Sequence, residues 1–422
     1  MSGSDSHRRT HLRWPLVGRL APPFGDDFVA VEATGALVLV AAVVGALAWA
    51  NIAPGSYESV WSHELTLGLG SVAMSHSLRE WIGEGLMTVF FFVLGLELKR
   101  ELVTGALRTA RIAALPIGAA VGGAILPALI FTLIVRGGSG ASGWAVPMAT
   151  DAALALGLVT AFGRRAAPGT KTILLAIAIV DDLIAILVIA LFFTGGLTAS
   201  GLLATAGAFA SVLGLRVAGV RHPLAYVPSG IALWLALGAA GIHPTVAGAA
   251  LGLLTPARPP ADAEILGRIE RRVHPWAALV VVPVFALASV GVEISADTLR
   301  ALGEPLALGV ALGLVVGKAV GIAVTGALLV RAHVAALPAG AGTGELVSVA
   351  FLGGIGLSVA LFITDLALDG ELAGQATMGI LVGSLISAGL GTIVVLATDR
   401  RRSRSRAGAS GSMSATDREE SV

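Results

Sequence analysis

The stretch Ala176-Ile-Ala-Ile-Val-Asp181-Asp182-Leu-Ile-Ala-Ile-Leu-Val-Ile-Ala190 places two adjacent carboxylates inside an otherwise unbroken apolar run. With its flanks, this run is long enough for a helix that spans a lipid bilayer. An ionisable side chain inside such a helix is costly and is a functional-site hypothesis by default. The rest of the chain must therefore explain what makes two buried acids tolerable and useful.

The composition is that of a polytopic membrane protein. Of the 422 residues 55% are hydrophobic and only 13% are charged, and the mean hydropathy is +0.87, far above the range of soluble globular proteins. The 55 glycines suit helices that pack closely through small residues in lipid. Because cysteine is absent, disulfides, thiolate metal sites and cysteine nucleophiles are excluded.

Windows of about twenty apolar residues predict twelve membrane-spanning helices. The chain before the first helix is polar and lacks the early apolar core of a cleavable signal peptide, so the first helix is expected to remain. Gly238, Gly241 and Pro244 crowd the junction of the seventh and eighth helices. The predicted ranges are 28–51, 80–98, 112–135, 145–162, 172–194, 198–216, 223–239, 241–256, 274–292, 303–329, 345–367 and 374–398.

The distribution of positive charge supports twelve spans with both termini in the cytoplasm. In that topology 24 of the 28 lysines and arginines lie in cytoplasmic segments. Three lie outside (Arg79, Arg136 and Arg300) and one, Lys318, lies within the membrane. Basic residues favour the cytoplasmic side, and a missed or extra helix would scramble this asymmetry.

A short β-hairpin is predicted in the first external loop. Glu64–Leu67 alternates between polar and apolar residues, and the apolar segment Val72–Met74 follows after residues 68–71, as the strands and turn of a short hairpin do. An irregular loop is the alternative interpretation.

The chain divides into three predicted segments: a cytoplasmic N-terminal segment (1–27), a membrane transport domain (28–398) and a cytoplasmic tail (399–422). The tail is rich in Ser, Gly, Arg and acids, and we expect it to be disordered. Its arginines are expected to hold the last helix to anionic lipid; a binding site for a partner is the alternative.

Few charged or polar side chains fall within the predicted spans. Thr150 and Asp151 lie on the fourth, Asp181 and Asp182 on the fifth, and Lys318 on the tenth. Neighbouring helical residues point about 100° apart, so one aspartate can face a central cavity while the other reaches a neighbouring helix.

The chemistry of these residues indicates competition between a cation and protons. Two close carboxylates repel in the absence of a cation and should titrate as a coupled pair. A hard monovalent cation needs oxygen ligands, which Asp181 and Asp182 can supply with a hydroxyl or freed carbonyls near Thr150. Lys318 could neutralise one aspartate or carry a proton; a fixed structural ion pair is the alternative.

Breaks in two helices point to an inverted-repeat transporter. The fourth helix is interrupted at Pro147–Asp151 and the eleventh at Gly353–Gly356. These are corresponding places in helices 3–5 and 10–12, a pattern typical of transporters with half-helix ends at the bilayer midplane. Asp151 would then balance positive half-helix N-termini, and Lys318 negative C-termini.

A series of longer motifs carries a specific resemblance. They are Phe90–Leu102, Ala149–Gly157, Ala176–Ala190, Gly241–Gly248, His274–Trp276, Val284–Ala288, Gly317–Lys318 and Gly354–Ser358. In this order and at these depths, they make the chain resemble the NhaA family of bacterial sodium/proton antiporters over essentially its whole membrane portion.

The resemblance implies a secondary transporter rather than an enzyme. The implied protein is a homodimer in the bacterial inner membrane that exchanges Na+ or Li+ for H+ electrogenically. Its implied roles are pH homeostasis and salt tolerance, and no cofactor or nucleic acid is expected. Asp182 matches the principal cation ligand, Asp181 its partner and lysine-paired acid, and Lys318 that lysine. Thr150 and Asp151 match residues at the helix crossing.

The family is also activated by rising pH through a cytoplasmic funnel. An ordinary charged helix end is the alternative for most of the matching residues, and a packing histidine is the alternative for His243. The candidate pH-regulating residues are Glu84, Glu97, Arg100, Glu101, Glu270, His274 and His243.

The chain departs from the family pattern in three places. Arg271 stands where some relatives have histidine, which puts the pH profile in doubt. Ser289-Val290 replaces a common Asn-Ala near the end of the ninth helix, and Pro244 follows His243 where small residues are common.

Other classes of protein remain as competing hypotheses. An intramembrane aspartyl protease needs two acids that face each other from different helices, whereas Asp181 and Asp182 are adjacent. A sodium-coupled symporter of organic anions would need further polar or aromatic groups, and only 5% of the chain is aromatic. A sensor or scaffold without transport activity would have little reason to carry Lys318.

Overall fold

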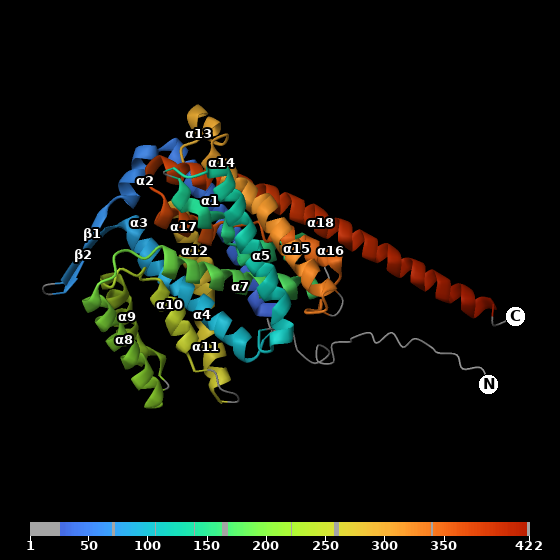
Figure 1. The fold of residues 1–422 in the computed structure, drawn as a ribbon, viewed down its shortest axis with the longest axis horizontal. Helices are drawn as coiled ribbons and strands as arrows, with labels where there is room; N and C mark the ends of the chain where they lie inside the picture. Colours follow the sequence, from blue (N-terminus) through green and yellow to red (C-terminus); the bar gives the residue numbers. More distant parts are fainter. Residues whose placement is uncertain are drawn as a thin grey trace.

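The computed structural model describes residues 26–419, except residues 70, 71, 106, 139, 163–167, 221, 257–260, 339 and 340. Nearly all of the described chain is helical, as predicted for an all-α membrane protein (Figure 1). The arginines of the predicted N-terminal segment 1–27 lie outside the described residues.

The elements follow one another as helices with short connections and one pair of strands. The first part contains α1 (Asp26–Ile52), α2 (Pro54–Trp61), β1 (Glu64–Leu69), β2 (Val72–Ser77), α3 (Leu78–Trp81), the π-helical turn η1 (Ile82–Leu86), α4 (Met87–Val103), α5 (Ala110–Val135), the 3-10 helix η2 (Ala141–Met148), α6 (Ala152–Phe162), α7 (Pro168–Phe192) and α8 (Ala199–Val217). The second part contains η3 (Pro223–Tyr226), α9 (Val227–Ala239), α10 (Val246–Leu254), α11 (Ala261–Trp276), the π-helical turn η4 (Ala277–Val281), α12 (Val282–Ser289), α13 (Ala296–Ala301), α14 (Pro305–Leu312), the π-helical turn η5 (Gly313–Lys318), α15 (Ala319–Arg331), α16 (Thr343–Leu352), α17 (Ser358–Ala367) and α18 (Gly370–Glu419).

Within the described residues, nine helical segments are long and apolar enough to cross a membrane. They match nine of the twelve predicted spans. The seventh, eighth and eleventh predicted spans correspond to shorter helices, namely η3 with α9, α10, and α16 with α17. Because α10 has only nine residues and a perpendicular crossing needs about twenty, the multi-pass fold is clear but the number of crossings stays a prediction.

Two spans are broken where the sequence predicts. Ala149–Asp151 separates η2 from α6, and residues 353–357 separate α16 from α17. The breaks touch each other, because the Asp151 N–H donates to the carbonyl oxygen of Ile355 at 2.6 Å. Backbone groups freed from their own helices are thus paired across the crossing, as burial away from water requires.

A glycine allows the two breaks to approach this closely. A Cβ atom on Gly356 would lie 2.5 Å from the carbonyl oxygen of Ala149, nearer than real Cβ contacts. The crossing therefore depends on a residue without a side chain at this position.

Small residues also bring whole helices together around the crossing. α5 packs against α15 and α7, and α4 packs against α10. A Cβ on Gly122 of α5 would lie 2.7 Å from the Gly321 carbonyl of α15, and a Cβ on Gly95 of α4 would lie 2.5 Å from the Ala249 carbonyl of α10. These backbone contacts are the close packing that small residues permit in lipid.

The predicted hairpin is present and longer than expected. β1 pairs antiparallel with β2, from Glu64 opposite Ser77 to Leu69 opposite Val72. The Oγ atoms of Thr66 and Ser75 lie 2.9 Å apart across the strands. The hairpin projects from the helical bundle (Figure 1).

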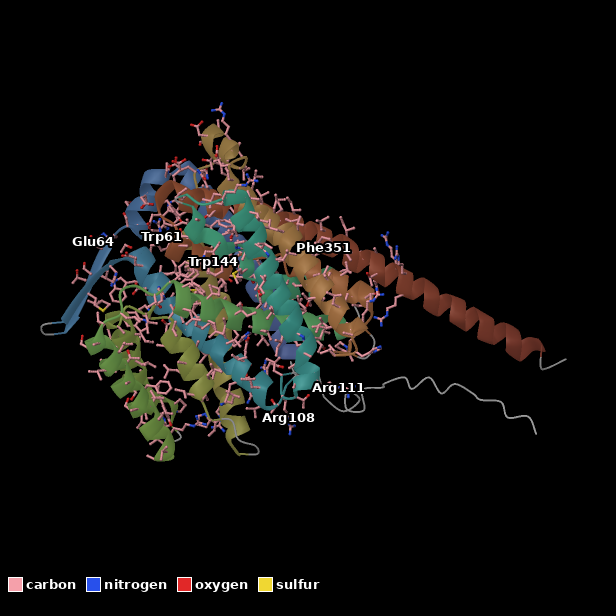
Figure 2. The ribbon with its side chains drawn as sticks, in the orientation of Figure 1. Trp61, Glu64, Arg108, Arg111, Trp144 and Phe351 are labelled. Carbon is pink, nitrogen blue, oxygen red and sulfur yellow. The ribbon has the colours of Figure 1, made fainter. Side chains whose placement is uncertain are left out.

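Loops predicted on opposite sides of the membrane lie at opposite ends of the bundle. Arg108 and Arg111, predicted to be cytoplasmic, lie at the lower end in Figure 2. α2 and α13, predicted to be external, lie toward the upper end in Figure 1.

The last helix differs from its predicted end at residue 398. α18 continues through Glu419 and extends beyond the bundle (Figure 1), so the tail predicted to be disordered is helical here through that residue. The three-segment division of the chain otherwise stays a prediction, as does the inverted-repeat relation between the two triplets.

Candidate functional site

Asp181 and Asp182 lie side by side in the middle of α7 and are both buried. Asp181 is 2% exposed and Asp182 is 5% exposed. They face different neighbours, as the helical spacing predicts: Asp181 faces η5, and Asp182 lines a cavity.

Lys318 forms a buried ion pair with Asp181. Lys318 is 0% exposed, and its Nζ atom lies 2.5 Å from Asp181 Oδ2. It is the last residue of η5, and π-helical turns are frequent at functional sites. A buried ammonium group without a partner would be strongly destabilising, so the aspartate makes the lysine tolerable.

Thr150 lies at the helix crossing beside this pair. It is 3% exposed, lies close to the Asp181 carboxylate, and its Oγ1 donates a hydrogen bond to the Gly353 carbonyl at 2.8 Å. The other oxygen of Asp181, Oδ1, is buried and has no hydrogen-bond partner among the described residues by standard geometry.

Asp151 caps two half-helices at once. Its Oδ1 accepts a hydrogen bond from the Leu154 N–H at 3.1 Å, in the first turn of α6. Its Oδ2 accepts from both the N–H (3.2 Å) and the Oγ (2.8 Å) of Ser358, the first residue of α17. The carboxylate therefore lies at two positive N-termini, where negative charge is stabilised.

Lys318 does not contact helix C-termini in an equivalent way. Its hydrogen bond within the described part of the chain goes to Asp181. The role of Lys318 in balancing C-terminal ends, which the break pattern predicts, stays a prediction.

A cavity of about 70 Å3 connects Asp182 with a group of charged residues at the ends of α1, α4 and α11. Thr150, Asp151 and Asp182 line its inner end, and Glu32, Glu97 and His274 line its outer end. No hydrogen bond joins the Asp182 carboxylate to the side chain or backbone of another described residue. This carboxylate is thus free to take a ligand from the cavity.

The inner end of the cavity offers several oxygen atoms to a ligand. Asp182 and Thr150 line the cavity, and Asp181 lies close to Thr150 with its Oδ1 lacking a hydrogen-bond partner among the described residues. The Thr150 hydroxyl donates to Gly353 and can still accept through its lone pairs. Oxygen ligands of this type suit a hard cation, and carboxylates also bind protons. The arrangement can hold a monovalent cation or protons, and each would reduce the affinity for the other.

The outer end of the cavity holds a cluster of ion pairs from three helices. Arg100 of α4 pairs with Glu270 of α11. His274 Nε2 of α11 lies 2.6 Å from Glu32 Oε1 of α1 and 3.7 Å from Glu97 Oε1 of α4.

Five of the predicted pH-regulating residues are therefore brought together. Four of them, Glu97, Arg100, Glu270 and His274, belong to the ion pairs just described. The fifth, Glu101, lies beside Arg100, with its Oε1 3.9 Å from Arg100 Nε. This end of the bundle is a network of partly and fully buried charges.

The remaining two predicted pH-regulating residues lie elsewhere. Glu84 belongs to η1, at the opposite end of α4, where its carbonyl oxygen accepts a hydrogen bond from Trp234. The His243 ring packs edge-on against Phe362, and its Nδ1 lies 2.8 Å from Thr245 Oγ1.

Two residues of the site escaped the sequence-based prediction. Glu32 was counted as part of the first apolar helix, although its charge on α1 was a visible signal. Ser358 was quoted only within a glycine-rich motif, and nothing in the local sequence indicates that it binds Asp151.

Comparison with known proteins finds a family and relatives that match most of this chain. The model of the family described as Na+/H+ antiporter 1 matches residues 26–395. The chain is 40% identical to the Na(+)/H(+) antiporter NhaA of Oleidesulfovibrio alaskensis, over 90% of this chain and 94% of the relative. It is 43% identical to the Na(+)/H(+) antiporter NhaA 2 of Pseudomonas syringae, over 88% of this chain and 94% of the relative.

A solved structure has a similar fold. The sodium proton antiporter MjNhaP1 from Methanocaldococcus jannaschii, solved at pH 8, matches with a TM-score of 0.54 and 16% identity. The match covers 88% of this chain and 97% of the solved one.

Proposed function

This chain belongs to the Na+/H+ antiporter 1 family, and from that membership we propose that it is a secondary transporter that exchanges Na+ for H+ across a bacterial inner membrane. Its nearly full-length relatives named as Na(+)/H(+) antiporters support the substrates. Both termini are assigned to the cytoplasm, because that topology places 24 of the 28 basic residues there.

The observation that carries the proposal is the uncommitted oxygen set at the helix crossing. Asp182 lines the cavity, and Asp181 Oδ1 has no hydrogen bond among the described residues by standard geometry. Of the two buried carboxylates, Asp181 pairs with Lys318, and Asp182 has no ion pair among the described residues. A cation or a proton must bind the carboxylate oxygens that have no partner in the protein, because buried polar groups without partners are costly.

Exchange follows from competition at these carboxylates. Na+ or Li+ binds Asp182 with help from Asp181 and Thr150, and protons bind the same carboxylates when the cation leaves. Because the two ligands exclude each other, loading one releases the other. The broken helices η2–α6 and α16–α17 then expose the crossing to either side of the membrane, as in alternating access.

In this scheme the exchange is electrogenic, as the family resemblance implies, because the carboxylates take up more than one proton for each Na+ that leaves. Asp181, paired with Lys318, supplies a second carboxylate beside Asp182 for this proton uptake. A membrane potential should therefore change the exchange rate.

The charged cluster at the outer end of the cavity supports control by pH. His274 lies between Glu32 and Glu97, and histidine titrates in the physiological range. Rising pH changes the charge of this network and with it the entry of the cation. The functional unit is proposed to be a homodimer, as the family resemblance implies.

Inside-out vesicles with an acidic interior test the proposal. Addition of NaCl or LiCl should release protons from the interior, reported by a pH-gradient dye, whereas choline chloride should not. Vesicles from cells that lack the protein serve as the matched control. Absence of a response to Na+ and Li+ at every pH from about 6.5 to 9 would refute the proposal.

A further inference from the structure

α17 carries another acid, Asp365, on the side of the crossing away from the cavity. It lies seven residues beyond Ser358, the residue bound by Asp151. At 1.5 Å per residue it is about 10 Å from the crossing, which is less than the roughly 15 Å half-thickness of the hydrocarbon core. A carboxylate at this depth calls for a functional explanation.

Asp365 is the first exposed residue of α17. Residues 358–364 are all buried, and Asp365 is exposed. Many protein atoms nevertheless surround its carboxylate, so it lies in a recess and not on a protruding face. Because a carboxylate facing lipid would be expensive, the recess must admit water.

An aromatic cluster separates this recess from the cavity at Asp182. Phe362, one turn before Asp365, lies with its ring centroid 5.3 Å from that of Phe91 and 6.0 Å from that of Phe285. All three rings are at most 2% exposed. The cavity at Asp182 and the recess at Asp365 are therefore on opposite sides of a packed apolar layer.

Among the described residues, one oxygen of Asp365 has a hydrogen-bond partner and the other has none. Ser289 Oγ, at the end of α12, donates a hydrogen bond to Asp365 Oδ2 at 2.8 Å. The described structure shows no ion pair between Asp365 and a basic side chain.

Within the described part of the chain, Arg79 is the basic side chain whose charge acts on Asp365, and it is already paired. Its NH2 group lies 3.0 Å from Glu58 Oε2, and its Nε donates to the carbonyl oxygen of Ala288. Arg79 therefore leaves the negative charge of Asp365 largely available to a mobile cation.

We propose that Asp365 and Ser289 form an outer cation station on the external side of the membrane, away from the outer end of the cavity. At this station a hydrated monovalent cation binds between the paired aspartates and the external medium. The inference rests on the proposed exchange function. A carboxylate and a hydroxyl supply two oxygens and water supplies the rest, which gives weak binding. Weak binding suits a station that ions must both enter and leave, and the negative charge raises the local cation concentration.

The first test measures access of external water to Asp365. Because the chain contains no cysteine, an Asp365→Cys variant carries a single thiol. A membrane-impermeant, cationic thiosulfonate reagent added outside intact cells should label Asp365→Cys and the exposed control Asp369→Cys. It should not label Thr364→Cys, because Thr364 is 0% exposed. Labelling of Asp369→Cys without labelling of Asp365→Cys would overturn the inference.

The second test measures cation affinity from each side separately, in right-side-out and inside-out vesicles. Asp365→Asn should raise the external Na+ concentration for half-maximal exchange by roughly threefold to tenfold, because one charge is removed. The concentration required on the cytoplasmic side should not change. Asp365→Glu should restore the external affinity, and Asp369→Asn should behave as the unaltered protein, because it removes an acid outside the recess.

The two proposals fail in distinguishable ways. If the unaltered protein exchanges no Na+ from either side, the exchange function is refuted. If it exchanges Na+ and Asp365→Asn has the same external affinity, or weakens both sides equally, only the outer station is refuted.

Discussion

The two ends of the cavity that leads to Asp182 both contain buried acidic residues. They differ in whether the carboxylate oxygens have ion-pair or hydrogen-bond partners. At the outer end, Glu32 and Glu97 flank His274, and Arg100 pairs with Glu270. At the inner end, Lys318 pairs with Asp181 alone, and among the described residues Asp182 has no ion pair and Asp181 Oδ1 has no hydrogen bond.

This difference separates regulation from binding. Carboxylates held by protein cations have fixed positions and change only when the network changes its charge. Carboxylates with unfilled oxygens bind whatever ligand the cavity supplies. The inner end should therefore decide whether exchange occurs, and the outer end should decide under which conditions it occurs.

The largest expected effect comes from Asp182→Asn at the inner end. Loss of the cation-binding charge should lower the exchange rate by roughly 100-fold or more, equivalent to about 2.7 kcal/mol of barrier. Proton release from inside-out vesicles measures the rate, and immunoblotting of the membranes verifies insertion. Asp297→Asn, on the exposed helix α13, is the matched control. An inserted Asp182→Asn variant with substantial exchange would refute the assignment of the inner end.

The next effect concerns stability at the same end. Lys318→Met leaves the buried Asp181 without its cation, which costs roughly 3–5 kcal/mol. We expect a lower thermal unfolding midpoint in detergent, and its recovery in the double variant Asp181→Asn/Lys318→Met. Arg100→Met should cost less, because the Arg100 side chain is 18% exposed and Lys318 is fully buried, so the pair of Arg100 with Glu270 is less completely removed from water. Equal losses in Lys318→Met and Arg100→Met would erase the contrast between the two ends.

The smallest effect is expected from Glu32→Gln at the outer end. This change removes a charge next to His274 but no proposed cation ligand. The pH of half-maximal exchange should move by about one unit or less, equivalent to ~1.4 kcal/mol, while the maximal rate stays within about twofold. Rates at saturating Na+ over a pH series provide the measurement. A tenfold lower maximal rate with an unchanged pH profile would assign Glu32 to transport and not to regulation.

Several features of the fold were predictable from sequence because they depend on local physical chemistry. The apolar runs, the breaks near Thr150 and Gly353, and the hairpin are each encoded by neighbouring residues. The number of crossings was less predictable, because Gly241 and Pro244 delay the start of α10 to Val246. Such a short helix gives a weak apolar signal.

The candidate site was partly predictable. The cost of isolated buried charges suggested that Lys318 neutralises one of the two aspartates, and the family resemblance alone assigned Asp181 as that partner. Glu32, Ser358 and Asp365 were missed, because each acquires its role from a contact with a residue at least 76 positions away. Glu84 and His243 were grouped with the charged cluster, yet they lie apart from it.

The sequence by itself determined that this chain crosses a membrane many times and carries an acid pair and a lysine in apolar surroundings. Hydropathy and the cost of buried charge act residue by residue, so they can be read without a fold. Only the tertiary structure decided which carboxylate oxygens have an ion-pair or hydrogen-bond partner in the protein. The packing of α7 against the crossed breaks commits one Asp181 oxygen to Lys318 and leaves Asp182 open to the cavity. That distinction depends on distances between helices, which no local pattern specifies.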